Sequence, residues 1–182
     1  MDRALIERAR GGDRDAYAEV ATLSSHRLYA VALRVLRDPD TASDAMQAAL
    51  VRIWRDLPTL RDPDLYEAWS NRVLIRACSD ARRSVRRSVP SIDITGIESP
   101  LGDSQSMVAN RDELERAFAT LNLNQRAVLV LMYYEDLSVA EIAASLGISV
   151  GTVKSRLHGA RNALRAAIDA DSRLQVPVER PA

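Results

Sequence analysis

The stretch Leu137–Ile168, L-S-V-A-E-I-A-A-S-L-G-I-S-V-G-T-V-K-S-R-L-H-G-A-R-N-A-L-R-A-A-I, decides the fold of the second half of the chain. Ser138 and Glu141 form a capping box, because a hydroxyl at the start of a helix and a carboxylate one turn later satisfy exposed backbone N–H groups. Gly147 supplies the backbone freedom for a sharp turn, and Ser149 is placed to cap the next helix. The pattern predicts two helices joined by a turn.

The second of these helices has an apolar side and a basic side. Its apolar stripe consists of Val153, Leu157, Ala160, Leu164 and Ile168. Its opposite side carries Lys154, His158, Arg161 and Arg165, with Ser155 and Asn162 at the edge. Residues 149–168 contain no Asp or Glu. Two helices joined by a glycine turn, with cationic and amide groups outward, form the arrangement that places a recognition helix in the major groove of DNA. The alternative is a solvated face on an ordinary helix pair.

The composition favours an all-α protein. Among 182 residues, 47% are hydrophobic, and Gly and Pro number only 7 each. No long alternating β-branched run occurs, so strands are not expected. The 25 basic and 25 acidic residues cancel, so affinity for nucleic acid must come from the local distribution of charge.

Several functional classes find no support in the residues. The single cysteine, Cys78, excludes an internal disulfide and a cysteine metal cluster, and we expect it to be a buried apolar residue. No metal site or cofactor is predicted. Neither a signal peptide nor an apolar run of about twenty residues is found, so we expect a cytoplasmic protein without direct membrane insertion.

The first half reads as a series of amphipathic helices. We expect a helix over 2–10, followed by a helical stretch over 13–37 whose two apolar stripes include Leu23. The next helix runs from a cap at Asp40 or Thr41 to Pro58. After a loop at 59–64, the last helix of this half covers 65–87. Ala42, Ala45, Met46, Ala49, Leu50, Ile53 and Leu57 are expected to be the buried face of the third helix. In the last helix, an apolar stripe begins at Leu65 and includes Trp69.

That last helix is strongly basic. Between Arg72 and Arg87, a single acid, Asp80, opposes six arginines, which leaves a local excess of five positive charges. These arginines are Arg72, Arg76, Arg82, Arg83, Arg86 and Arg87. Such density suits a surface that follows a nucleic-acid backbone. Trp69 is interpreted as core, with base stacking as the alternative.

A change in amino-acid composition predicts a division of the chain into two domains. Pro90–Ala109 is rich in Ser, Gly, Pro and acids and lacks helical periodicity, which predicts a flexible linker. We therefore expect a first helical domain at 1–88, a linker at 89–109, a second helical domain at 110–168 and a disordered tail at 169–182. In the second domain, Asn110–Glu113 and Asn124 are predicted to begin helices.

Two separated stretches resemble the extracytoplasmic-function (ECF) group of bacterial RNA polymerase sigma factors, from Ala16 to Ile168. The run E-I-A…L-G-I-S…G-T-V-K-S-R-L is similar to region four of that family, and D-A-M-Q…R-I-W, followed by A-W…R-V and D-A-R-R, is similar to region two. The resemblance implies a promoter-specificity subunit without enzymatic activity or cofactor. Its implied partners are core RNA polymerase, through the β′ clamp helices and the β flap, promoter DNA, and an anti-sigma factor.

The resemblance also implies roles for individual residues. Those matching the minus-10 helix are Arg72, Asp80, Arg82 and Arg83, and Arg76 of the same helix is expected to bind the minus-10 element with them. Those matching the minus-35 reader are Thr152, Lys154, Ser155, Arg156, His158 and Arg161, of which Thr152 and Arg156 are expected at the DNA backbone. Asp44 and Gln47 match the contact surface for the β′ clamp helices. From the residues alone, Lys154 and Arg161 could donate either to guanine or to phosphate.

Some positions depart from the family pattern. Arg76 stands where the family usually has Asn, and Ser70-Asn71 replaces a more apolar pair. Ala48 replaces an acid, and Gly159 replaces a commonly basic residue. These departures bear on promoter melting and on base contacts.

Two other functions are alternatives to the promoter-specificity subunit. A DNA-binding regulator that acts alone would need a dimer interface or a receiver domain in the first half, and neither is found. An enzyme would need a catalytic constellation, yet His26 and His158 are far apart in sequence and no small-molecule substrate site is indicated. The linker predicts that two weak DNA contacts act together once polymerase fixes their separation.

Overall fold

In this computed structural model, residues 1–88 and 114–174 are described, and they form helices and turns without a strand, which confirms the all-α prediction. The first half comprises α1 (Arg3–Arg10), α2 (Arg14–Leu36), α3 (Pro39–Asp56) and α4 (Tyr66–Ser88), with short 3-10 turns at Leu57–Thr59 and Pro63–Leu65. The second half comprises a helical segment at 114–119, α6 (Leu123–Tyr133), α7 (Val139–Leu146) and α8 (Val150–Leu174). The expected linker at 89–109 and the cap at Asn110–Glu113 lie outside the described residues.

Aspartate caps begin the first three helices. Asp2 and Asp13 accept the N–H groups that open α1 and α2. For α3 the expected cap at Asp40 or Thr41 is wrong: Asp38 accepts the Thr41 N–H at 2.8 Å, and Pro39 occupies the first turn. Proline fits there because its preset backbone angle is helical and the N–H it lacks would be unbonded anyway.

The core of the first half lies among α2, α3 and α4. Its largest fully buried side chains include Leu28, Ile53, Tyr66 and Leu74. Two positions expected in apolar stripes, Leu23 and Leu65, are instead 57% exposed. Residues 14–36 form one continuous helix, and Leu65 lies in the 3-10 turn before α4, out of register with its buried face. Tyr66 takes the buried position and bonds Ser24 at 3.0 Å.

The second half has the predicted helix pair. Ser138 and Glu141 form the capping box at α7, and Gly147 turns the chain at φ 67°. Two boundaries differ from expectation. Asn122, rather than Asn124, caps α6 through a box with Gln125, and α8 continues beyond Ile168 to Leu174, into the segment expected to be disordered.

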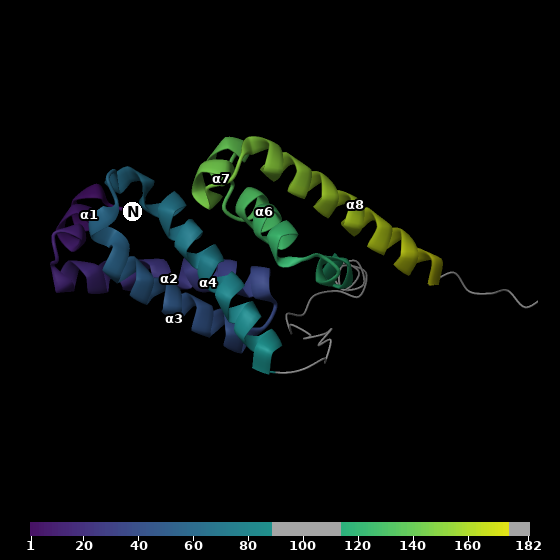
Figure 1. Cartoon of the computed structure of the whole chain (residues 1–182), viewed down its shortest axis with the longest axis horizontal. Helices are drawn as coiled ribbons and strands as arrows, with labels where there is room; N and C mark the ends of the chain where they lie inside the picture. The colour runs from purple at the N-terminus through teal and green to yellow at the C-terminus, as the bar shows by residue number, and fades with distance from the viewer. Residues whose placement is uncertain (89–113, 175–182) are drawn as a thin grey trace, which may run out of the picture.

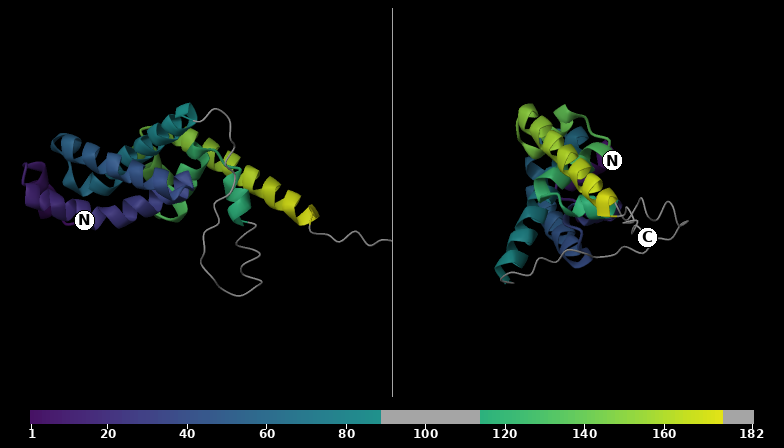
Figure 2. Two further views of the ribbon diagram at one scale, coloured as in Figure 1. Left: turned by 90° about the horizontal axis from the view of Figure 1, so that it is seen from below. Right: turned by 90° about the vertical axis from the view of Figure 1, so that its right-hand side faces the viewer.

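The two halves pack against each other. Helices α6, α7 and α8 lie along one side of the α2–α4 bundle (Figures 1 and 2). The contacts between the halves run from α4 to α7 and from α2 to α6. We call this the docked arrangement. It was not predicted from the sequence.

Candidate nucleic-acid interface

The outer face of α8 is positioned by its first turn. The Ser149 hydroxyl accepts the Thr152 N–H at 3.0 Å, and Val153 and Leu157 are buried below. This orientation leaves Lys154, Ser155, His158 and Arg161 exposed, with Thr152 and Arg156 partly buried. The predicted minus-35 residues are therefore divided between an exposed set and a pair at the edge of the helix.

Local hydrogen bonds hold some of these exposed groups. A guanidinium nitrogen of Arg161 donates to the Tyr133 hydroxyl at 2.8 Å, which ties the middle of α8 to the end of α6. A ring nitrogen of His158 lies 2.9 Å from the Asn162 amide nitrogen. The cationic and imidazole groups are thus partly ordered while remaining accessible to a ligand.

The basic face of α4 carries the predicted minus-10 residues. Arg76 and Arg83 are exposed, and Arg82 is partly buried. Asp80 pairs with Arg52 of α3 at 2.8 Å and with Arg83. Hydrogen bonds from these arginines, the bond from Arg52 foremost, hold the pKa of Asp80 below its usual value. The one acid on this face is therefore neutralised within the protein and leaves the face cationic.

Arg72 of α4 makes a different contact. Its Nε donates to the Ser145 carbonyl oxygen at 2.8 Å, and its Nη2 donates to the Ala144 carbonyl oxygen. These carbonyls belong to the C-terminal turn of α7, where the helix leaves oxygens unbonded and concentrates partial negative charge. A predicted minus-10 residue thus holds the helix-turn-helix unit of the second half.

A second polar network joins the halves next to this contact. Arg27 of α2 pairs with the Glu135 carboxylate at 2.5 Å, and their side chains are only 24% and 10% exposed. The other bonds of Arg27 go to Asn71 at 2.7 Å and to Ser70 at 2.8 Å. Ser70 and Asn71, which depart from the family pattern, therefore belong to the polar network that holds the docked arrangement. Arg27 and Glu135 were missed, because no local pattern indicates a contact across the linker.

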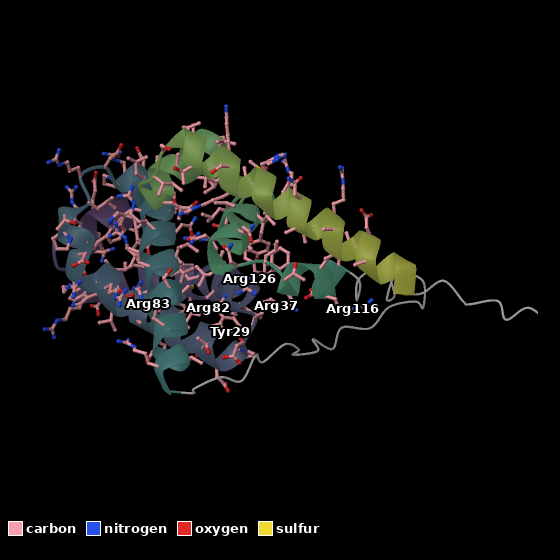
Figure 3. All side chains as sticks on the ribbon, turned by 45° about the vertical axis from the view of Figure 1, so that its right-hand side comes forward. Tyr29, Arg37, Arg82, Arg83, Arg116 and Arg126 are labelled. Carbon is pink, nitrogen blue, oxygen red and sulfur yellow. The ribbon has the colours of Figure 1, made fainter. Side chains whose placement is uncertain are left out.

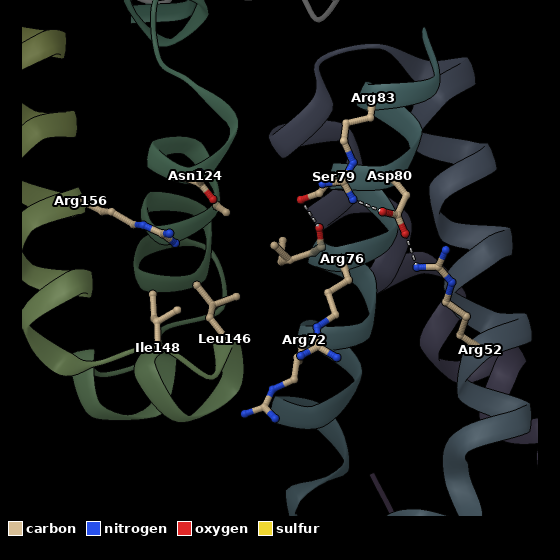
Figure 4. A pocket seen from close by; sticks show the side chains of 12 residues that line it. Arg52, Arg72, Arg76, Ser79, Asp80, Arg83, Asn124, Leu146, Ile148 and Arg156 are labelled. Atoms are coloured by element: carbon tan, nitrogen blue, oxygen red, sulfur yellow. Dashed lines mark hydrogen bonds and ion pairs between the residues drawn. The ribbon is translucent and has the colours of Figure 1, made fainter. Parts of the chain in front are cut away.

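A cavity of about 440 Å³ separates α4 from the helix-turn-helix unit (Figure 4). Its lining residues are Arg52, Arg72, Ile75, Arg76, Ser79, Asp80, Arg83, Asn124, Ala127, Leu146, Ile148 and Arg156. Residues predicted for separate promoter elements, Arg76 of α4 and Arg156 of α8, thus line one cleft. The exposed face of α8 lies outside it.

The predicted polymerase contacts lie on another surface. Asp44 and Gln47 are exposed on α3, one helical turn apart, and the Gln47 amide bonds the Ser43 hydroxyl at 3.4 Å. Ala48 is exposed beside them. The structure places this pair together and apart from the cleft residues.

Cys78 is fully buried in α4, as expected, and burial raises the pKa of its thiol to about 12. Within residues 1–88 and 114–174, no group of three or more His, Cys, Asp or Glu side chains could hold a metal ion. The helices in these ranges are too short or too polar to cross a membrane.

Comparisons with known proteins agree with this geometry. Residues 23–88 match the family described as Sigma-70 region 2, and residues 111–164 match the family described as Sigma-70, region 4. The RNA polymerase sigma-E factor of Streptomyces coelicolor is 38% identical over 146 residues, which cover 78% of this chain and 81% of the relative. The ECF RNA polymerase sigma factor SigL of Mycobacterium tuberculosis is 38% identical over 142 residues, covering 76% and 80%.

A solved structure extends the similarity to three dimensions. The sigma factor RpoE of Bartonella quintana, in complex with the anti-sigma factor NepR, is 25% identical, with a TM-score of 0.66 over 90% of this chain and 98% of that one. The two family matches occur in the expected order along the chain. Together with the two relatives and the similar solved structure, they agree with the helix-turn-helix unit and the basic α4. The chain belongs to the ECF RNA polymerase sigma factors.

Proposed function

We propose that this sigma factor reads the minus-35 element with the exposed face of α8 and opens the minus-10 element with the basic face of α4, while bound to core RNA polymerase. The observation that carries the proposal is the outer face of α8, where Lys154, His158 and Arg161 are exposed. Residues 149–168, which begin with the hydroxyl cap of this helix, contain no acid. A recognition helix needs this combination of protruding donors and a fixed N-terminus.

At the minus-35 element, Lys154 and Arg161 donate to base edges, and Thr152 and Arg156 donate to the backbone. The free N–H groups at the start of α8 add a phosphate contact. Ser155 and His158 complete the reading surface. Arg161 is already oriented by the Tyr133 hydroxyl, which lowers the entropy that its immobilisation on DNA would cost.

At the minus-10 element, Arg76, Arg82 and Arg83 neutralise phosphates of the opened strand, and Asp80 orients Arg83. Arg72 belongs to the same surface, but its guanidinium is occupied by α7. We infer that the two halves separate before the minus-10 element binds. Promoter binding by the free protein is therefore weak, because the chain must first leave the docked arrangement.

The partners follow from the same assignment. Asp44 and Gln47 contact the β′ clamp helices of core polymerase, and the second half reaches the β flap. An anti-sigma factor controls the protein, a proposal supported by the complex of RpoE with NepR among similar structures. The protein acts in the cytoplasm as an initiation factor with no catalytic chemistry of its own. The predicted division, with a first domain at 1–88 and a second that begins at 110, stays a proposal, and α8 carries the second domain past residue 168 to Leu174.

Transcription in vitro tests the proposal. Purified core polymerase is given a library of promoter fragments with and without the full chain, and start sites are mapped. The expected result is a set of starts that depends on the chain and shares minus-35 and minus-10 sequences. Starts that are the same without the chain would refute it. The paired substitution Asp44→Ala, Gln47→Ala should abolish both the starts and the binding of core polymerase. Arg61→Ala serves as the control, because Arg61 is exposed and is not one of the residues proposed to contact polymerase or DNA.

A further inference from the structure

Arg126 of α6 is a buried cation that has no counterion among the residues that the structure describes. The residue is 5% exposed, and its Nε is buried with no hydrogen-bond partner. Burying an ionised group without a partner is among the most costly features of a folded chain. A site of this kind is stable when an anion completes it.

Two further arginines face the same junction. Arg37 lies at the end of α2, where the chain turns at φ 63°, and Arg82 lies on α4. Figure 3 shows Arg37, Arg82 and Arg126 gathered near Tyr29 of α2. Desolvation, followed by the charges of Arg82 and Arg37, lowers the pKa of Arg126 to about 10. Three helices from both halves of the protein thus bring like charges together.

The nearby carboxylates do not neutralise this group. Glu115 pairs with Arg37 at 2.9 Å, and Asp80 is taken by Arg52 and Arg83. Against Arg37, Arg82 and Arg126, the single charge of Glu115 leaves an excess of two positive charges. A phosphate group carries about two negative charges at neutral pH and has three oxygens to accept from guanidinium groups.

We propose that Arg37, Arg82 and Arg126 form a binding site for the phosphate group of a small phosphorylated ligand at the junction of α2, α4 and α6. A small anion suits the site better than a nucleic-acid backbone does, because Arg126 is only 5% exposed. The site shares Arg82 with the proposed minus-10 surface, whereas Arg37 and Arg126 belong to no proposed promoter contact.

Occupation of the site favours the docked arrangement. Arg37 and Arg82 belong to the first half and Arg126 to the second, so the ligand binds all three only while the halves are together. A ligand that binds one of two arrangements shifts the equilibrium toward it. The phosphorylated ligand therefore opposes the separation that promoter binding requires.

The test uses the full chain and pyrophosphate as the probe, with chloride adjusted to keep ionic strength constant. Calorimetric titration should give saturable binding at one site, and small-angle scattering should show a smaller radius of gyration when the probe is bound. Arg126→Gln and Arg37→Gln should each weaken binding at least about tenfold, the value of one charge-assisted hydrogen bond. The control Arg61→Gln should bind as the unaltered chain does.

Three outcomes would overturn the proposal. Unchanged binding by both Arg126→Gln and Arg37→Gln would place the probe elsewhere, and the Arg37 variant keeps this test valid if the buried substitution fails to fold. Binding that never saturates would mark an adventitious ion only. Binding of a short single-stranded oligonucleotide with no binding of pyrophosphate would assign the arginines to a nucleic-acid backbone. A failure of the transcription test, by contrast, would leave this site untouched.

Discussion

At the scale of single residues, the exposed cations of α8 are the proposed readers of the minus-35 element. Lys154→Ala or Arg161→Ala should weaken minus-35 use by about 1–3 kcal/mol if the side chain donates to a base edge. The measurement is transcription from a promoter with its own minus-35 sequence against one in which this element is scrambled. A base contact predicts loss on the first and little change on the second. Equal losses on both would assign the side chain to phosphate.

Arg126 makes a prediction for stability. Arg126→Met should raise the free energy of unfolding by about 1–4 kcal/mol in phosphate-free buffer, because an unpaired buried charge is replaced by an apolar group of similar length. Denaturant titration measures the difference. The folded protein holds the Arg126 proton less tightly than the unfolded chain, since the pKa is lowered to about 10. The advantage of Met should therefore shrink as the pH rises through 10. A less stable variant would contradict this account.

Cys78 reports on opening of the first half. Burial raises the pKa of its thiol to about 12, so at pH 8 the folded protein presents no reactive thiolate. Modification by a thiol reagent should proceed only at the rate of unfolding, and at once in denaturant. In a Cys78→Ala background, Ser155→Cys on exposed α8 should react rapidly. The unfolded thiol ionises first, so this group's contribution to stability falls as the pH rises above 9.0.

At the scale of elements, the turn between α7 and α8 serves both the recognition helix and the docked arrangement. Gly147 has φ +67°, and a Cβ there would lie 3.3 Å from the Arg72 guanidinium carbon. Gly147→Ala should lower the free energy of unfolding by about 1–2 kcal/mol through backbone strain, and should also displace Arg72. Gly12 is the matched control, because its φ is +93° and nothing lies within 4 Å of the added Cβ.

Chemical denaturation measures the strain in both variants, and small-angle scattering measures docking. Both substitutions should reduce stability, but only Gly147→Ala should increase the radius of gyration. An equal increase for Gly12→Ala would mean that strain alone, rather than the Arg72 contact, governs docking.

The elements themselves follow largely from local chemistry in the sequence. The capping box at Ser138 and the turn at Gly147 were predicted and confirmed, because caps and turns depend on residues close together in the chain. The first residues of α3 and α6 were predicted wrongly. Pro39 moved the start of α3 to Asp38, and the α6 cap lies at Asn122, since several adjacent polar residues can each cap a helix and packing selects one.

The site was predictable only in part. The outward face of α8 follows from helical periodicity, and Asp44 and Gln47 follow from the family pattern. By contrast, the contacts of Arg27 with Glu135 and of Arg72 with α7 join residues separated by more than sixty positions. No period or spacing encodes such a contact. The predicted roles of the individual DNA-contacting residues stay predictions.

At the scale of the whole molecule, we infer that the balance between docked and separated halves controls access to the minus-10 surface of α4, where Arg72 is bound to α7. Glu135→Gln removes one charge of a pair whose side chains are 24% and 10% exposed, which leaves Arg27 without its counterion. The substitution should increase the separated population, because breaking a poorly exposed ion pair costs more than breaking one in solvent. Scattering should show a larger radius of gyration, and binding of the free chain to promoter DNA should strengthen.

Glu7→Gln provides the matched control for this prediction. It breaks the exposed Arg3–Glu7 pair of α1 at 3.0 Å, whose side chains are 52% and 47% exposed, and it should change neither quantity. A Glu135→Gln protein that remains as compact as the unaltered chain would show that the remaining contacts suffice for docking.

The hydrogen bonds of Arg72 to the end of α7 give one side chain two mutually exclusive uses. A substitution of Arg72 would delete a proposed promoter contact and, at the same time, release the second half. Apparent affinity is the intrinsic affinity multiplied by the fraction of chains able to bind, so the second effect offsets part of the first. Over evolutionary time, promoter preference can therefore drift at this position with a smaller loss of binding than at an exposed arginine such as Arg76.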